Sequence, residues 1–154
     1  GKTTLMRQLL SEQFPEYDGS LYPRGEWPTG QPLIEAFDTA EEGRDLLNGV
    51  GLCSVPSWCK PYGVLSNGEK YRANVALALQ RRRGGTPVVF DEWTSELDRD
   101  LGRSVSLALG KRLRRESVAG AGSQGSYVFT TCHDDVANYL QPELICYCSV
   151  GEAP

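Results

Sequence analysis

The sequence lacks the features of a membrane or secreted protein. No apolar run approaches the roughly 20 residues that a membrane-spanning helix needs, and no basic-then-apolar signal peptide opens the chain. There is only one histidine, and the five cysteines form no C-x-x-C pair of the kind found in zinc or thioredoxin sites. We therefore expect a cytoplasmic protein whose cysteines are free, buried thiols.

Composition and charge are those of an ordinary globular chain. Of the 154 residues, 40% are hydrophobic and 23% are charged, which excludes collagen-like, disordered and supercharged classes. The length fits a single domain over residues 1–154. There are 20 acidic and 16 basic residues, and the net charge of −4 argues against general nucleic-acid binding. Two basic clusters, at residues 81–83 and 111–115, fall at predicted helix ends, where cations complement the helix dipole.

Hydrophobic periodicity predicts an alternation of helices and strands. Helical patterns cover residues 4–14, 39–48, 66–83, 97–115 and 134–140. Strand patterns cover residues 32–37, 86–90, 127–131 and 144–147, and a long loop covers 49–64. The runs at 86–90 and 127–131 are apolar on both faces, as in a buried parallel sheet. We expect an α/β fold with a mainly parallel sheet flanked by helices, in which ligands bind beyond the carboxyl ends of the strands.

The chain opens on Gly1-Lys2-Thr3-Thr4, at the start of a predicted helix. Such a start offers a phosphate free backbone N–H groups and the positive end of the helix dipole, with a lysine for the terminal phosphates and a hydroxyl for Mg²⁺. A capped helix start without a ligand explains these four residues equally well.

The strand that ends on Asp91-Glu92 supplies the second half of a nucleotide site. Asp91, held at a strand end, can hold the Mg²⁺ shell. Glu92 can orient and polarise a water that attacks the terminal phosphate, although a solvated acid at a strand exit is the simpler alternative. The two halves together favour a nucleoside triphosphate site.

Three further segments occur in the order of a known family. They are Leu65-Ser66-Asn67-Gly68-Glu69, Ser95-Glu96-Leu97-Asp98, and His133 at the end of the next strand. Together with Lys2-Thr3 and Asp91-Glu92, they make the chain resemble the ATP-binding cassette (ABC-type) P-loop ATPases. In that family the segment at 65–69 is similar to the signature, the segment at 95–98 to the D-loop, and His133 to the switch histidine. Lys2-Thr3 is similar to Walker A, and Asp91-Glu92 is similar to Walker B.

Each of the three added segments also has a structural explanation. Ser66 and Glu69 have the spacing of a capping box, which would stabilise the helix whatever the protein does. Asp98 suits the first turn of a helix. His133 can be a partly buried histidine at a strand end.

The resemblance implies how the substrate, ATP, and its Mg²⁺ are bound. Lys2 and the N–H groups of Gly1 to Thr4 would hold the β- and γ-phosphates. Thr3 and Asp91 would hold the metal. The fold would be P-loop NTPase-like.

The resemblance also implies a homodimer. Two cassettes would pair head to tail, and the signature residues Ser66, Asn67, Gly68 and Glu69 of one would close over the γ-phosphate bound by the other. Glu92 would be the catalytic base, and His133 would sense the γ-phosphate. Asp98 would couple the two sites.

The chain departs from the family pattern at several places. It starts within Walker A, so the resemblance implies a domain that is incomplete at its N-terminus. Asn67 and Glu69 replace the Gly and Gln of the family signature, which indicates a divergent branch. The stretch between the first motif and the signature is short, so we expect a reduced or absent helical subdomain and a soluble cassette rather than a transporter subunit. Glu35 is the best placed substitute for the Q-loop glutamine, and Gln31 is a weaker one.

These patterns predict ATP binding and Mg-dependent ATP hydrolysis. The alternative is a nucleotide-dependent clamp or switch with little turnover, which could be DNA-associated if the two basic clusters bind nucleic acid. The sequence around Asp91 and His133 is similar to that of small bacterial and phage cassette ATPases. Some of those lie beside or are fused to acetyltransferase-like domains. A fused or adjacent partner domain is therefore a further expectation.

Overall fold

The computed structural model describes residues 1–22, 25–81, 86–118 and 126–148. Its helices are α1 (Lys2–Gln13), α2 (Ala40–Gly49), α3 (Val55–Trp58), α4 (Asn67–Gln80), α5 (Arg99–Val118) and α6 (Val136–Leu140). Two 3₁₀ turns are η1 (Leu33–Ala36) and η2 (Tyr62–Val64), and the strands are β1 (Val88–Phe90) and β2 (Tyr127–Phe129). None of the helices in these ranges combines the length and apolar character needed to cross a membrane.

The two strands form a parallel pair, with Val89 opposite Val128. On the other side of β1, Tyr22 makes a parallel bridge to Phe90. The Tyr22 N–H donates to the Val89 carbonyl oxygen at 2.8 Å, and the Asp91 N–H donates to the Tyr22 carbonyl oxygen at 3.0 Å. The predicted α/β class and parallel pairing of residues 86–90 with 127–131 are therefore confirmed, over shorter strands than expected.

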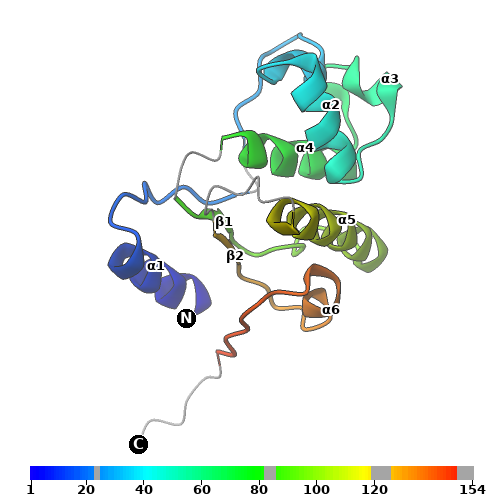
Figure 1. Cartoon of the computed structure of the whole chain (residues 1–154). Helices are drawn as coiled ribbons and strands as arrows, with labels where there is room; N and C mark the ends of the chain where they lie inside the picture. Colours follow the sequence, from blue (N-terminus) through cyan, green and yellow to red (C-terminus); the bar gives the residue numbers. More distant parts are fainter. Residues whose placement is uncertain (23–24, 82–85, 119–125, 149–154) are drawn as a thin grey trace, which may run out of the picture.

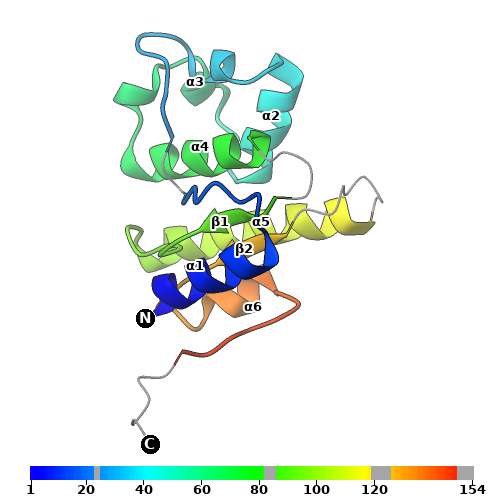
Figure 2. The ribbon, with the colours of Figure 1, turned by 90° about the vertical axis from the view of Figure 1, so that its left-hand side faces the viewer.

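Helices cover both faces of the sheet. Successive side chains of β1 point to opposite faces, and each face packs in its own hydrophobic cluster. Val89 packs with Met6 and Leu10 of α1. Val88 and Phe90 point to the opposite face and join the main core, which includes residues of α2, α4 and α5. Figures 1 and 2 show α1 and α5 on opposite sides of the strands.

Helices α2, α3 and α4 gather with η1 at one end of the molecule (Figure 1, top). The predicted start of α2 is confirmed, since the Thr39 hydroxyl accepts the Glu42 N–H at 3.1 Å. A helical unit thus lies between the first motif and the signature. That it is a reduced subdomain stays a prediction.

Two predicted strands are wrong. Residues 32–37 contain η1, because the Glu35 N–H bonds locally to the Pro32 carbonyl oxygen at 3.0 Å and Pro32 makes only an isolated bridge to Pro61. Residues 144–147 form neither helix nor strand, and Leu144 is 86% exposed. An apolar run becomes a strand only where a neighbouring strand can pair with it.

The predicted burial of the cysteines is also wrong. All five are free thiols, and all are exposed: Cys53, Cys59, Cys132, Cys146 and Cys148. None lies inside a helix or strand. Cysteine is usually buried, but these five lie in loops or next to the ends of helices and strands, where their side chains are exposed.

Candidate functional site

The N-terminus of α1 lies at the carboxyl edge of the sheet. The Thr3 hydroxyl donates to the two carboxylate oxygens of Asp91 at 3.1 and 3.2 Å. The Lys2 Nζ donates to the Thr131 carbonyl oxygen at 2.8 Å, just beyond β2. No side chain caps the helix at Gly1, so the first-turn N–H groups and the positive end of the helix dipole face this edge. The structure therefore brings together the residues that the sequence predicted for phosphate and metal binding.

The Thr3 hydroxyl and the Asp91 carboxylate offer the type and the number of oxygen ligands that Mg²⁺ takes from a protein in nucleotide sites. Both are hard donors, and Mg²⁺ in nucleotide sites is commonly held by one or two carboxylates plus phosphates and water. In the parts of the chain described above, no group of three or more His, Cys, Asp or Glu side chains could enclose a metal. Such an open donor set suits a cation that arrives with a nucleotide.

Thr130, directly after β2, contacts both acids that follow β1. Its hydroxyl donates to Asp91 Oδ1 at 2.5 Å and accepts the Glu92 N–H at 2.9 Å. Its side chain is 9% exposed. Sequence reasoning missed this residue, although a hydroxyl at the end of the strand paired with the acidic strand was a usable signal.

The turn after Asp91 has a strained backbone. Glu92 has φ 51° and Thr94 has φ 65°, which is the left-handed region that β-branched residues rarely adopt. The Thr94 N–H donates to the Tyr71 hydroxyl of α4 at 3.0 Å, and Gly102 of α5 leaves room for the Thr94 side chain. Burial raises the pKa of Tyr71 well above its ordinary value, so this hydroxyl stays protonated. Neighbouring elements thus hold a conformation that costs energy, as is common at functional sites.

A cavity of about 380 Å³ lies against the two acids. Its lining residues are Arg7, Gly19, Leu21, Tyr22, Tyr71, Asp91, Glu92, Ser95 and Glu96. The volume falls within the usual range of small-molecule sites. Arg7, Tyr22 and Tyr71 were not predicted as site residues, because their approach to Asp91 depends on tertiary packing.

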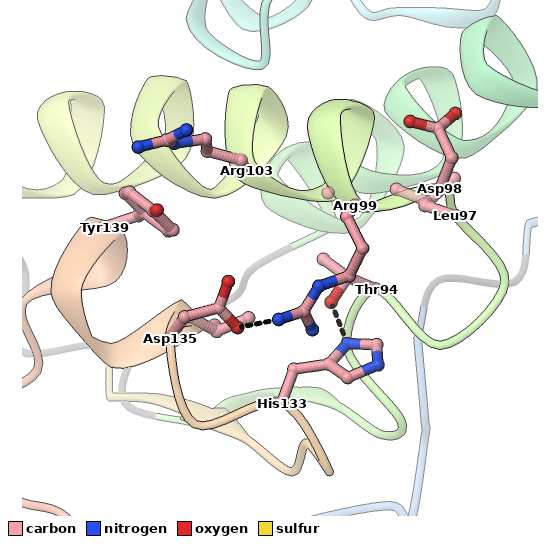
Figure 3. Close-up of a pocket in the computed structure, with 10 residues that line it drawn as sticks. Thr94, Leu97, Asp98, Arg99, Arg103, His133, Asp135 and Tyr139 are labelled. Atoms are coloured by element: carbon pink, nitrogen blue, oxygen red, sulfur yellow. Dashed lines mark hydrogen bonds and ion pairs between the residues drawn. The ribbon is translucent and has the colours of Figure 1, made fainter.

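His133 is linked to the same turn (Figure 3). Its Nδ1 lies 3.2 Å from the Thr94 hydroxyl, which itself donates to the Trp93 carbonyl oxygen at 2.7 Å. Beside it, Arg99 and Asp135 form an ion pair at 3.1 Å. His133 is therefore connected to Glu92 through two residues of one short turn.

Asp98 lies at the start of α5. Its Oδ1 accepts the Leu101 N–H at 2.9 Å, so Asp98 caps the first turn of α5. This is the structural role that the sequence offered as the alternative to a D-loop role. This capping leaves its role as a D-loop residue open as a prediction.

The predicted signature residues form the N-terminus of α4, and the capping box is confirmed. The Ser66 hydroxyl donates to Glu69 Oε2 at 2.8 Å, and the Ser66 N–H donates to the same oxygen at 2.9 Å. The Ser57 hydroxyl donates to Glu69 Oε1 at 2.6 Å. These bonds, with that from Ser57 the strongest, lower the pKa of Glu69 to about 2. The Ser66 hydroxyl is thus occupied by a carboxylate of its own helix.

The low pKa of Glu69 predicts an acid-sensitive contribution to folding. Because the folded-state pKa lies below the ordinary value of 4.5, the stabilisation is complete above about pH 4.5 and is lost as the pH falls toward 2. We expect Glu69→Gln to lower the free energy of unfolding by about 1 kcal/mol at pH 7, since partial exposure screens the charge, and by almost nothing at pH 2. Urea unfolding of both proteins across this pH range measures the difference.

A second variant tests the cause of that pKa shift. Ser57→Ala removes the bond that lowers the pKa of Glu69 most, while keeping the carboxylate. The acid-induced loss of stability should therefore begin at higher pH than in the unmodified chain. An unchanged pH dependence would contradict the assignment.

Other predicted residues lie apart from this edge. Glu35 is exposed on η1, Gln31 is exposed just before it, and neither lines the cavity. Of the basic clusters, residues 82–83 lie outside the described residues. In the second cluster, Arg112 donates to the Asp45 carbonyl oxygen at 2.9 Å and Arg114 to that of Leu140 at 3.1 Å. These two arginines connect α5 to α2 and to α6, and nucleic-acid binding by this cluster stays a prediction.

Comparison with known proteins supports a class of protein for this chain. The chain is 30% identical, over 131 residues, to the energy-dependent translational throttle protein EttA from two strains of Mycobacterium tuberculosis, CDC 1551 / Oshkosh and ATCC 25618 / H37Rv. The alignment covers 71% of this chain, which spans 23% of the length of these relatives. No family model matches the chain. The similarity supports a relationship to ATP-binding cassette ATPases at a coarse level.

Proposed function

We propose that this chain binds ATP and hydrolyses it with Mg²⁺, as the nucleotide-binding part of an ABC-type ATPase. The observation that carries the proposal is the hydrogen bond between Thr3 and Asp91, which joins the start of α1 to the end of β1. Three groups therefore meet at one edge of the sheet: the uncapped N–H groups at the start of α1, the Lys2 ammonium, and the Thr3 hydroxyl bonded to Asp91. These are the groups that a nucleoside triphosphate with its metal requires.

Each residue then has a defined task. Lys2 leaves the Thr131 carbonyl and pairs with the β- and γ-phosphates, while the first N–H groups of α1 bind their oxygens. Thr3 and Asp91 would hold the Mg²⁺, which would supply charge neutralisation on the phosphates. Glu92 takes a proton from the attacking water, and His133 donates to the γ-phosphate.

The partner in this proposal is a second copy of the chain. The N-terminus of α4 would face the γ-phosphate of the other copy, with Ser66 and Gly68 as contacts. Because Ser66 is bonded to the ionised Glu69, its hydroxyl must exchange that partner for the phosphate. Asp98, at the start of α5, would couple the two sites, and Glu35 would serve as the Q-loop substitute. What the ATP cycle drives depends on a fused or adjacent partner domain.

Replacing Lys2 tests the proposal directly. In the full-length protein we expect Lys2→Ala to weaken ATP binding by about tenfold or more, because a charge-assisted bond to the phosphates is lost. Titration with a fluorescent ATP analogue measures the affinity, and phosphate release measures turnover. Lys111→Ala, which removes an exposed lysine of α5, is the matched control and should change neither. A full-length protein that neither binds nor hydrolyses ATP would contradict the proposal.

A further inference from the structure

Thr130 is the one residue whose hydroxyl is bonded to both Asp91 and Glu92 among the described contacts. We propose that it is a positioning residue for the metal ligand and for the base of the proposed ATPase. This inference rests on the proposed function. The Thr130 hydroxyl fixes the Asp91 carboxylate through its proton and the Glu92 backbone through its oxygen.

The need for this hydroxyl follows from the bonds of Asp91. Its side chain accepts hydrogen bonds from Thr3 and Thr130. The single proton of the Thr3 hydroxyl is shared between the two Asp91 oxygens at 3.1 and 3.2 Å, and the same hydroxyl oxygen would also bind the metal, so this contact alone would hold the carboxylate loosely. Thr130 supplies a second bond to Asp91 Oδ1 from the segment that follows β2, so this bond does not depend on the position of α1. The bond is protected from water since the Thr130 side chain is 9% exposed.

The second bond of the same hydroxyl acts on Glu92. This residue has φ 51°, a conformation that a non-glycine residue keeps only when its surroundings enforce it. The Glu92 N–H donates to Thr130 Oγ1 at 2.9 Å, and the next N–H, of Trp93, donates to the Thr130 carbonyl oxygen at 2.7 Å. The residue that directly follows β2 thus sets the backbone that aims the Glu92 side chain.

The isosteric replacement Thr130→Val removes the hydroxyl and keeps the shape of the side chain. In the full-length protein we expect it to raise the Mn²⁺ concentration that half-saturates the ATP complex by about tenfold or more. Electron paramagnetic resonance of free Mn²⁺ measures this without turnover. ATP binding in excess EDTA should stay within about twofold, since Lys2 and the start of α1 are unchanged. Thr130→Ser restores the hydroxyl and should restore the metal affinity.

Ser106→Ala controls for general destabilisation. Ser106 is fully buried, and its hydroxyl accepts the Trp93 Nε1–H at 2.8 Å, but it does not touch Asp91. We expect a lower unfolding temperature and an unchanged Mn²⁺ affinity. If the unmodified protein binds Mn²⁺ with ATP and Thr130→Val binds it equally well, only the role of Thr130 is overturned. If the unmodified protein binds neither, the proposed function and this inference fail together.

Discussion

Replacing Glu92 by Gln is expected to lower ATP turnover by about 100-fold or more while ATP binding is retained. The amide keeps the size of the side chain but cannot take a proton from the attacking water. Glu92 is exposed at the cavity beside Asp91, and its backbone is bonded to Thr130, so the substitution leaves the surrounding hydrogen bonds in place. The expected protein binds ATP and stalls before hydrolysis.

Single-turnover hydrolysis and equilibrium ATP binding, measured on the same preparation of the full-length protein, separate these two effects. Glu96→Gln is the matched control, because Glu96 lines the same cavity and is exposed but follows the turn. It should change turnover by less than about threefold. Equal losses for the two variants would contradict the assignment of Glu92 as the base.

The same Glu92→Gln protein tests the proposed pairing of two chains. A stalled ATP complex should accumulate as a dimer in gel filtration with ATP and Mg²⁺, and should return to monomer when the nucleotide is removed. The clamp alternative differs in one respect. It expects ATP-dependent dimers together with negligible turnover in the unmodified protein, so steady hydrolysis by that protein counts against it.

The parts of the fold that were predictable from sequence are those set by local interactions. The start of α4 follows from Ser66 and Glu69, whose capping box is complete within four residues. The strand at Val88–Phe90 follows from its apolar character on both faces. The bridge from Tyr22 to Phe90 was missed, because it is a single pairing in a segment rich in Pro and Gly.

The candidate site divides in the same way. Asp91 and His133 could be found because parallel strands end at one edge of a sheet, so that residues just after each strand come together. Thr94 and Tyr71 could not be found from the sequence. Their hydrogen bond joins α4 to a turn with a left-handed backbone, and no local sequence pattern predicts that backbone. Tertiary contacts decide which neighbours support a motif, while the motif itself is local.

The core beneath the site should be the most sensitive part of the molecule to truncation. Trp93 directly follows Glu92, is 0% exposed, and packs edge-on against Phe90 and Phe129 at ring distances of 5.1 and 5.2 Å. Its Nε1–H donates to the Ser106 hydroxyl.

We expect Trp93→Ala to lower the free energy of unfolding by about 3–5 kcal/mol, because the cavity left among these rings cannot close and the Ser106 hydroxyl oxygen loses its donor. Urea unfolding followed by circular dichroism measures the loss. Trp27→Ala is the control. Trp27 is only half-buried, although it stacks on Tyr62 at 4.9 Å and donates to Asn74, so its truncation should cost less. Equal losses for the two tryptophans would contradict the expectation that the buried Trp93 contributes more to stability than the half-buried Trp27.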